Sequence, residues 1–466
     1  MTALLWLRRD LRVHDHPALH AALETGDPVV PVFCIDHRLL HGRHRSGSRT
    51  QFMLEALIDL DRSLRALGSR LVVRAGSPER ELPALAQELR AGSVHFSVDA
   101  GPFARARDRR VQAAMRSNGV AVCPHPGLFV VDRPAAIKTG ADRPYTVFTP
   151  YLRSWLQAPR RPVLPVPDSL PAVGRAVPVG GIPRLEDLGL SQEVPEPARG
   201  GERPAREALD RFLAGGAAEY DQRNDLPAQD GTSRLSPYLH FGCVSPREIE
   251  HRLTGEGGGP EAVRRQLCWR DFYAQVLHSH PGNARSEFQP RYRGAIRWSH
   301  AKARFQAWCD GRTGYPLVDA GMRQLRREGW MHNRVRLVVG SFLTKDLGID
   351  WRWGERWFMR WLIDGDEANN NGNWQWIASV GVDPQPAFRR IYNPARHQER
   401  FDPEGAYVRR YVPELAPVPD RYLAEPWTMP EEAQSECGCV IGRDYPAPIV
   451  DHLAARREAL ERYRVT

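Results

Sequence analysis

Residues 4–12 read LLWLRRDLR, a short apolar run that ends abruptly in charged residues. An uninterrupted apolar run of this length is typical of a strand buried on both faces, as in parallel sheets. Four similar runs follow within the first 130 residues. Between the runs lie amphipathic segments such as Thr50–Leu67, whose apolar residues recur every three or four positions. The five expected strands are Leu4–Leu7, Val29–Ile35, Leu71–Arg74, Val94–Val98 and Val120–Cys123.

This alternation predicts an α/β domain built on a doubly wound, five-stranded parallel sheet, with a ligand beyond the carboxyl ends of its strands. The first strand is followed by Arg8–Arg12 and not by G-x-G-x-x-G, so a conventional dinucleotide fold would lack its phosphate turn.

The rest of the chain changes character twice. Nine prolines fall between Pro159 and Pro197, which indicates an interdomain linker, and helical patterns dominate from about Ala205. Ser236-Pro237 predicts a helix N-cap followed by proline, and Ser245–Glu248 is a capping box. We therefore predict an α/β domain at 1–130, a linker at 131–204 that is proline-rich from 159, and an all-α domain at 205–466.

Composition excludes several classes of protein. The 466 residues are 42% hydrophobic and 26% charged, which fits a soluble globular protein and neither a disordered nor a membrane-spanning one. The seven cysteines are scattered, without the spacing of a disulfide framework, a zinc site or an iron-sulfur site. We expect no metal and a reducing cytoplasm.

Positive charge is concentrated in one region. Between Pro281 and Arg360 there are sixteen Lys and Arg against seven Asp and Glu, an excess equal to the net charge of +9 of the whole chain. Nine of the thirteen Trp lie between Trp298 and Trp376. Interleaved basic and aromatic residues favour binding of a nucleic acid, and a solvated basic face over a Trp-rich core is the alternative.

Two polar segments are candidates for ligand binding. Thr232–Ser236 lies at the entrance of an expected helix, where backbone N–H groups favour phosphate, although its hydroxyls could simply cap that helix. The run Asp364–Trp376 lacks the pattern of a calcium loop. Its carboxylates and amides can instead bind a heterocycle and sugar hydroxyls, with Arg336 as a partner for Asp364, unless the run is only a solvated loop.

Six segments, taken together, resemble the photolyase/cryptochrome family, and within it the microbial class I cyclobutane pyrimidine dimer photolyases most of all. Their order and spacing match the family over nearly the whole chain. The segments are Arg8–Arg12, Thr232–Leu239, Trp269–Tyr273, Gly314–Ala320, Gly329–Arg334 and Asp364–Trp376.

The resemblance implies that the helical domain holds FAD in a bent conformation. Asn370 matches the residue that faces flavin N5, and Trp374, Trp351 and Trp298 match a relay that carries electrons to the flavin. The other matched flavin contacts are Tyr220, Thr232, Ser233, Arg234, Leu235, Ser236, Asn333, Arg336, Asp364, Gly365 and Asp366.

The resemblance also implies light-driven DNA repair. Excited reduced FAD would give an electron to a cyclobutane pyrimidine dimer flipped out of UV-damaged DNA, and the dimer would split into two pyrimidines. We expect a monomer without an obligate protein partner, in the bacterial cytoplasm on nucleoid DNA. The matched DNA contacts are Gln266, Trp269, Tyr273, Asn333, Arg334, Trp376, His397 and Gln398.

Departures from the family pattern leave alternatives open. Gln266 stands where class I enzymes usually have Glu, and (6-4) photolyases also have Gln at this position. Leu337 replaces a Met that is common in the family. Asn333 opposes the (6-4) assignment, because those enzymes have a catalytic His there. A cryptochrome-type photoreceptor is a third reading, although an extended C-terminal tail is lacking, and a flavin-free nucleic-acid-binding protein is a fourth.

The family also implies an antenna chromophore in the N-terminal domain. We expect 8-hydroxy-5-deazaflavin in preference to 5,10-methenyltetrahydrofolate, because the Arg- and Ala-rich composition suggests a high-GC organism. The residues expected to line the antenna groove are Cys34, Asp36, Arg49, Asp99, Gly101, Arg105 and Arg107.

Overall fold

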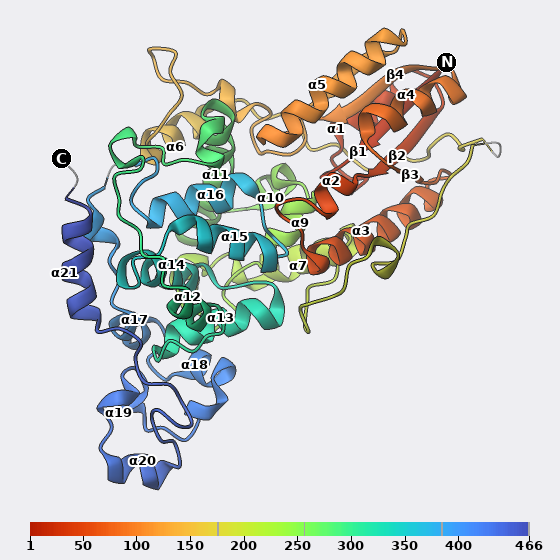
Figure 1. Ribbon diagram of the computed structural model, residues 1–466. Coiled ribbons are helices and arrows are strands. Elements are labelled where there is room, and N and C mark those ends of the chain that lie inside the picture. Colours follow the sequence, from red (N-terminus) through yellow and green to blue (C-terminus); the bar gives the residue numbers. More distant parts are fainter. Residues whose placement is uncertain (175–176, 256, 384, 465–466) are drawn as a thin grey trace.

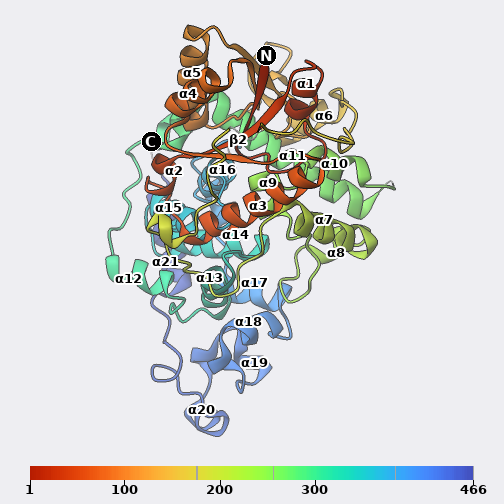
Figure 2. The same cartoon turned by 90° about the vertical axis from the view of Figure 1, so that its right-hand side faces the viewer.

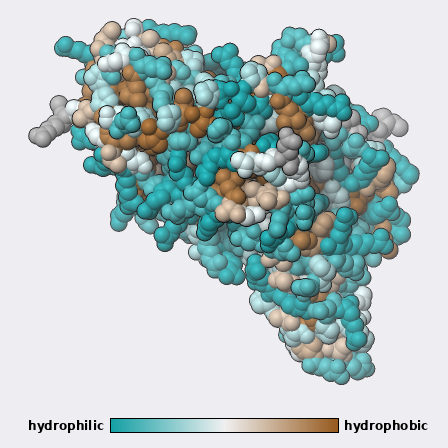
Figure 3. Space-filling model, turned by 180° about the vertical axis from the view of Figure 1, so that it is seen from behind, coloured by the Kyte–Doolittle hydropathy of each residue, from teal (hydrophilic) through white to brown (hydrophobic). Residues whose placement is uncertain are grey.

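The computed structural model describes residues 1–174, 177–255, 257–383 and 385–464. An α/β domain at the N-terminus docks against a larger helical domain, and helices α18 to α20 project from the far end (Figures 1 and 2). The face opposite to the view of Figure 1 is mostly hydrophilic, with small hydrophobic patches (Figure 3). No helix within the described residues is long and apolar enough to cross a membrane.

The N-terminal sheet confirms the prediction of five parallel strands. The strand order is β3-β2-β1-β4-β5, and every adjacent pair is parallel. The strands are β1 (Thr2–Leu7), β2 (Val29–Ile35), β3 (Val72–Ala75), β4 (Ala91–Ser97) and β5 (Ala121–His125). The helices between them are α1 (Pro17–Leu23), α2 (His37–Leu40), α3 (Gly47–Ala66), α4 (Pro78–Leu89) and α5 (Pro102–Ser117).

The sheet has a separate core on each face. Leu4 and Trp6 of β1 pack with residues of α4 and α5. Leu5 and Leu7, which point the other way, pack with residues of α1 and α3. This second core continues into the helical domain through Phe52, Tyr238 and Phe241, whose rings are in contact. The two domains therefore share one apolar core on that face.

The predicted linker contains a core helix. Helix α6 (Phe148–Gln157) lies within 131–204, and its Tyr151 and Trp155 are fully buried. The indole of Trp155 donates a hydrogen bond of 2.9 Å to Asp271 in the helical domain. Farther along, Val179 accepts a hydrogen bond from Val73 of β3. The segment is thus more than a connection, and a short helix among prolines gives too few periodic positions to be recognised.

The remainder of the described chain is helical, as predicted, apart from isolated bridges. The first helices are α7 (Glu202–Arg211), α8 (Tyr220–Arg223), α9 (Ser236–Phe241), α10 (Pro246–Arg252), α11 (Gly258–Ser279), α12 (Lys302–Cys309), α13 (Pro316–Glu328) and α14 (Asn333–Ser341). They are followed by α15 (Trp351–Trp361), α16 (Glu367–Ile377), α17 (Pro394–Phe401), α18 (Ala406–Tyr411), α19 (Asp420–Leu423), α20 (Glu431–Cys437) and α21 (His452–Arg462).

One of the two predicted helix caps is displaced. Leu235, not Ser236, is the N-cap of α9, and Ser236 is the first residue of that helix. Ser245 caps α10 as expected, because its hydroxyl accepts hydrogen bonds from the N–H groups of Arg247 and Glu248. Glu248 does not complete the capping box, since its carboxylate binds His14 at 3.0 Å.

Candidate functional site

The segment Asp364–Asn371 forms the turn between α15 and α16 and the first turn of α16. Asp366 is the N-cap of α16, and its carboxylate accepts hydrogen bonds from the backbone N–H and side-chain amide of Asn369 at 2.9 and 2.8 Å. This cap ends the preceding turn and starts α16, in which the side chains of Asn370 and Asn371 are buried. The run predicted as a possible solvated loop is instead ordered, and most of it is buried or partly buried.

The predicted pair of Arg336 and Asp364 is present, with Arg336 Nη2 at 2.8 Å from Asp364 Oδ2. The Asp364 side chain is only 4% exposed, and Arg336 is also held by the carbonyl of Met331. The other carboxylate oxygen, Oδ1, is buried and has no hydrogen-bond partner among the described residues. A buried acceptor of this kind requires a donor, and a ligand N–H or hydroxyl would supply one.

The three consecutive asparagines have different partners. Asn369 completes the cap of α16, Asn370 donates to the carbonyl of Glu355 at 3.0 Å, and Asn371 accepts from Gln375 at 3.3 Å. The Glu355 contact fixes the orientation of the Asn370 amide inside the domain. The group that matches the flavin N5 position is therefore held rigidly.

Charges from both domains meet beside this cluster. Arg9, which follows β1, lies 2.7 Å from Asp366 and 3.5 Å from Asp99. Burial raises the pKa of Asp366, but Arg9 and other cations outweigh burial and hold that pKa well below its usual range. Next to it, burial and the charges of Asp366 and Glu355 raise the pKa of Glu367 to about 7. One carboxylate is therefore firmly ionised and its neighbour titrates near neutral pH.

The segment Thr232–Ser236 contacts the chain just before α14 through the indole of Trp330. Trp330 donates to the Ser236 hydroxyl at 3.3 Å, and Arg234 lies over the Trp330 ring at 4.5 Å. The hydroxyl of Ser233 accepts a hydrogen bond from the N–H of Leu235 at 3.3 Å. This local capping contact is what the alternative to a phosphate site predicts. Ser236 is thus connected to the segment before Arg336, and Thr232 is partly buried nearby in sequence.

Tyr220 lies on α8, apart from these contacts. Its ring meets Phe212 edge to face at 5.8 Å, and burial raises its pKa to about 12.

The three tryptophans that the resemblance assigns to a relay lie on segments that contact one another. Trp374 of α16 packs against Phe358 of α15 at 5.0 Å, while Trp351 is the first residue of α15. The segment after Trp298 is hydrogen bonded to Gly348, three residues before Trp351, with a distance of 2.7 Å from Ser299 N to Gly348 O. Trp374 and Trp351 are buried and Trp298 is partly exposed, so the series runs from the interior to the surface.

Two of the predicted DNA contacts are exposed and three are partly exposed aromatic or basic groups. Gln266 and Asn333 are exposed. Trp269, Trp376 and Arg334 are partly exposed. Arg334 pairs with Asp225 and Trp376 donates to Asp383 at 3.2 Å.

The ring of Trp269 stacks on Phe148 of α6 at 3.6 Å with an angle of 3° between the planes. Phe148 carries no sequence signal of its own, because it begins a helix of only ten residues just before the proline-rich part of the linker. Its position therefore emerges only from the structure.

Two further predicted contacts do not face solvent. Tyr273 and Gln398 are 3% and 2% exposed, so both predictions of direct DNA contact are wrong for this conformation. Tyr273 lies beneath α16, where a Cβ on Gly372 would overlap its ring, and Gln398 is on the inner side of α17. His397, one residue earlier, is partly exposed and stacks on Tyr392 at 4.8 Å.

A groove of about 860 Å³ separates the two domains near the carboxyl ends of the strands. Six of the seven predicted antenna residues line it: Cys34, Asp36, Arg49, Asp99, Gly101 and Arg107. Arg105 does not line the groove, and instead donates to the carbonyl of His278 across the domain boundary at 2.8 Å. Phe33, Phe103 and Phe129 add apolar walls that the sequence did not identify.

The described residues contain no group of three or more His, Cys, Asp or Glu side chains arranged to hold a metal ion.

Comparisons with known proteins identify both domains. The family described as DNA photolyase matches residues 3–171, and the family described as FAD binding domain of DNA photolyase matches residues 263–465. A deoxyribodipyrimidine photo-lyase of Streptomyces griseus is 41% identical over 472 residues, which covers 99% of each chain.

Two solved structures have the same fold. The crystal structure of a bacterial class III photolyase from Agrobacterium tumefaciens is 36% identical, with a TM-score of 0.93 over 99% of this chain and 97% of that chain. The structure of a cryptochrome from Synechocystis is 29% identical, with a TM-score of 0.91 over 100% of this chain and 99% of that chain.

Proposed function

The chain belongs to the photolyase/cryptochrome family, and on that premise we propose that it is a deoxyribodipyrimidine photo-lyase that repairs UV-damaged DNA in light. The observation that carries the proposal is the buried Arg336–Asp364 pair with the fixed amide of Asn370 on the adjoining helix. The pair and the amide lie within the segment that matches the FAD-binding domain.

The chain's residues fit FAD. The unpartnered Oδ1 of Asp364 offers an acceptor to a polar N–H of the isoalloxazine or to a hydroxyl of its side chain. Arg336 places a positive charge next to that carboxylate, which stabilises negative charge on a nearby ligand. The other residues proposed to hold FAD are Tyr220, Thr232–Ser236, Asn333, Gly365 and Asp366. When bound and reduced, FAD supplies the electron that light transfers to the lesion and that returns after ring opening.

The amide of Asn370 suits this chemistry because it has no acidic proton. Its Nδ2 donates one hydrogen to the carbonyl of Glu355, and its carbonyl oxygen would accept a hydrogen bond from the ligand. An acceptor that cannot donate a proton preserves the reduced anionic state on which electron donation depends. Trp374, Trp351 and Trp298 would carry electrons from the surface to the oxidised cofactor.

The proposed lesion pocket lies between Trp269 and Trp376. Stacking of Trp269 on Phe148 fixes the plane of the indole, so that a flipped pyrimidine pair would meet a preformed aromatic wall. Arg390 lies over the ring of Trp376 at 4.0 Å and helps to fix that ring. Exposed Asn333 and Gln266 would offer amides to the carbonyls of the pyrimidines.

A (6-4) photolyase is the second candidate, because Gln266 is the residue of that class. Asn333 weighs against it, since it leaves no imidazole at the position of the catalytic histidine. Photoreception, as the similarity to a cryptochrome suggests, is a third possibility. The interdomain groove, with its apolar and arginine walls, is the proposed site of the antenna, for which we favour 8-hydroxy-5-deazaflavin over the folate.

The test is to incubate the reduced protein with oligonucleotides that carry either a cyclobutane dimer or a (6-4) product, in blue light and in darkness. We expect restored thymines only from the cyclobutane dimer and only in light. Restoration of the (6-4) product alone would identify the second candidate. Restoration in darkness, or no restoration of either lesion by flavin-loaded protein, would overturn the proposal.

A further inference from the structure

The basic region between Pro281 and Arg360 is only partly used by the proposed sites. Of its sixteen Lys and Arg, only Arg334 and Arg336 belong to the proposed DNA and flavin sites. The longest stretch without acidic residues in this region surrounds Trp298 in the chain, and its five basic residues are all exposed. We call these five residues the Trp298 patch: Arg291, Arg293, Arg297, Lys302 and Arg304.

The charges of the Trp298 patch have no acidic partner in the described part of the chain. The Nε of Arg291 donates to the side-chain amide of Gln289 at 3.2 Å, and the Nε of Arg293 donates to the carbonyl of Glu287 at 2.9 Å. Both acceptors are neutral. No ion pair or side-chain hydrogen bond between described residues involves the other three members, which are Arg297, Lys302 and Arg304.

The two acidic residues on either side of the patch in the chain are paired with other cations. Glu287 has a side chain that is only 4% exposed and lies 2.7 Å from Arg352, and Asp310 lies 3.2 Å from Arg326. Helix α12 begins at Lys302 within the patch, so the positive end of its dipole adds to the charge. The patch therefore presents a positive potential to the solvent, which attracts a negatively charged partner.

Trp298 is held at the surface within this patch. Its indole is partly exposed and meets the ring of Tyr463 edge to face at 6.3 Å. On one side Ile296 is buried in the core, and on the other the N–H of Ser299 donates to the carbonyl of Gly348 at 2.7 Å. The surface end of the proposed relay is thus fixed among the exposed cations.

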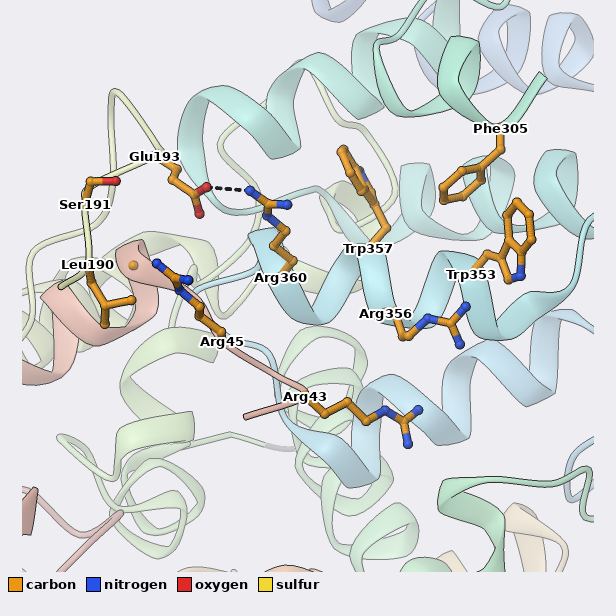
Figure 4. A pocket seen from close by; sticks show the side chains of 11 residues that line it. Arg43, Arg45, Leu190, Ser191, Glu193, Phe305, Trp353, Arg356, Trp357 and Arg360 are labelled. Atoms are coloured by element: carbon orange, nitrogen blue, oxygen red, sulfur yellow. Dashed lines mark hydrogen bonds and ion pairs between the residues drawn. The ribbon is translucent and has the colours of Figure 1, made fainter. Parts of the chain in front are cut away.

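Helix α12 keeps the second half of the patch in place. Phe305 stacks on the buried Trp308 at 5.7 Å and meets Trp353 of α15 at 5.0 Å. Figure 4 shows the rings of Phe305 and Trp353 side by side. This packing fixes the helix, and Lys302 and Arg304 remain exposed beside the packed face.

The patch lies away from the proposed lesion pocket. In Figure 2, α12 is at the left edge of the helical domain, whereas α6 and α17, which carry Phe148 and His397, lie toward the right. The cations around Trp298 are therefore separate from the surface proposed to bind the lesion. Their position around an indole favours a partner that exchanges electrons over a nucleic acid.

We propose that the Trp298 patch docks a small acidic redox protein, which donates one electron to Trp298 after light has oxidised that indole. This rests on the proposed function, in which Trp298 is the surface end of the relay. The reduced centre of the partner loses one electron and the indole cation radical of Trp298 gains it, so no bond breaks and no proton moves. Opposite charges on two open surfaces suit a transient complex, because they raise the rate of association more than the affinity.

The test follows the oxidation of a haem protein by the FAD-loaded protein in blue light, with FAD oxidised at the start and oxygen removed. Reduced soluble cytochrome b5 is the acidic probe, and reduced cytochrome c, which is basic, is the control of opposite charge. After subtraction of the dark rates, we expect cytochrome b5 to be oxidised about tenfold or more faster than cytochrome c. The difference should shrink as salt rises.

The triple variant R297Q/K302Q/R304Q should slow the light-driven oxidation of cytochrome b5 by about tenfold or more, because it removes most of the attracting charge. These side chains make no hydrogen bond to described residues, so their replacement should not disturb folding. The matched control R80Q/R109Q/R116Q removes three exposed charges from α4 and α5 and should leave the rate unchanged.

The variant W298F removes the indole that receives the electron and should abolish light-driven oxidation of cytochrome b5. The proposal is wrong if W298F is as fast as the wild type, if cytochrome c is oxidised as fast as cytochrome b5, or if the two triple variants behave alike. It is also wrong if R297Q/K302Q/R304Q loses only affinity for undamaged DNA, because the patch then binds nucleic acid.

Repair of cyclobutane dimers by chemically reduced protein tests the proposed function separately, since that assay needs no electron from a partner. In it, R297Q/K302Q/R304Q should repair at the wild-type rate.

Discussion

Two charged regions meet at the first turn of α16, and they are assembled in different ways. In the cluster Asp364–Asn371, the partners are near in sequence: Arg336 and Glu355 precede it by fewer than thirty residues. In the interdomain groove, Arg9 reaches Asp366 across 357 positions. The first region is a property of one segment and its supporting helices, whereas the second exists only when two domains dock.

Asp366 belongs to both regions, so its replacement should have the largest effect. Asp366→Ala removes the cap of α16 and leaves the half-buried Arg9 with Asp99 and Glu367 as its remaining acidic neighbours. Loss of one partner of a buried ion pair costs about 3–5 kcal/mol, and we expect a loss of this size in the free energy of unfolding, with loss of bound FAD. Denaturant unfolding and the flavin absorbance of the purified protein measure the two effects.

Asp366→Asn is the control, because an amide oxygen can still cap α16 while the charge is lost. It should retain part of the stability and more flavin than Asp366→Ala. If Asp366→Ala were as stable as the wild type and fully loaded with FAD, Asp366 would not connect the cluster Asp364–Asn371 to the interdomain groove.

The difference between the regions also explains what the sequence could predict. The sheet was predictable because buried parallel strands are continuous apolar runs, and each predicted strand overlaps an observed one. The Arg336–Asp364 pair was predictable because the carboxylates of the motif need a cationic partner and the basic region just before the motif supplies Arg336. The proposed Trp relay came from the resemblance alone, and the segments that carry its three members contact one another.

What the sequence missed depends on docking. Phe148 beneath Trp269 and the hydrogen bond from Arg105 to His278 both join residues more than 100 positions apart. The spacing of apolar residues along the chain predicts helices and strands but carries no information about such distant contacts. Tyr273 and Gln398 were misplaced for the same reason, because a motif shows that a residue is near the site but not which side of its helix packs inward.

Glu367 lines the interdomain groove next to Asp366, and the pH dependence of the stability tests its environment. Its pKa is raised from 4.5 to about 7, so the folded protein keeps this proton at pH values where the unfolded chain has released it. The free energy of unfolding should therefore fall as the pH rises from about 4.5 to about 7, by up to about 3 kcal/mol from this group.

Glu367→Gln should abolish that part of the fall and be more stable than the wild type at pH 8 but not at pH 4. Urea unfolding at several pH values measures this difference. Replacement of the exposed Glu431 of α20 by Gln is the control and should leave the pH profile unchanged. A Glu367→Gln variant with the wild-type profile would mean that Glu367 is solvated in solution.

Trp376 lies on α16 after the cluster Asp364–Asn371 and forms one wall of the proposed lesion pocket. Trp376→Ala should weaken binding of dimer-containing DNA by about 1–3 kcal/mol, the contribution of one aromatic stack, and leave the FAD content unchanged. Fluorescence anisotropy with damaged and undamaged oligonucleotides measures the loss. Trp353→Ala, on the far side of α15, is the control. Loss of FAD from Trp376→Ala would assign this residue to the flavin site instead.

Arg105 gives the smallest expected effect, because it does not line the groove and contributes a single interdomain hydrogen bond. Arg105→Ala removes its bond to the carbonyl of His278 and should lower the free energy of unfolding by about 1 kcal/mol. Repair by the reduced, FAD-loaded protein should stay at the wild-type rate, because none of the flavin or lesion residues contacts Arg105. Arg109→Ala, on the same helix but exposed, should change neither quantity. A large loss of repair in Arg105→Ala would show that domain docking positions the flavin cluster, and the two regions would then be one functional unit.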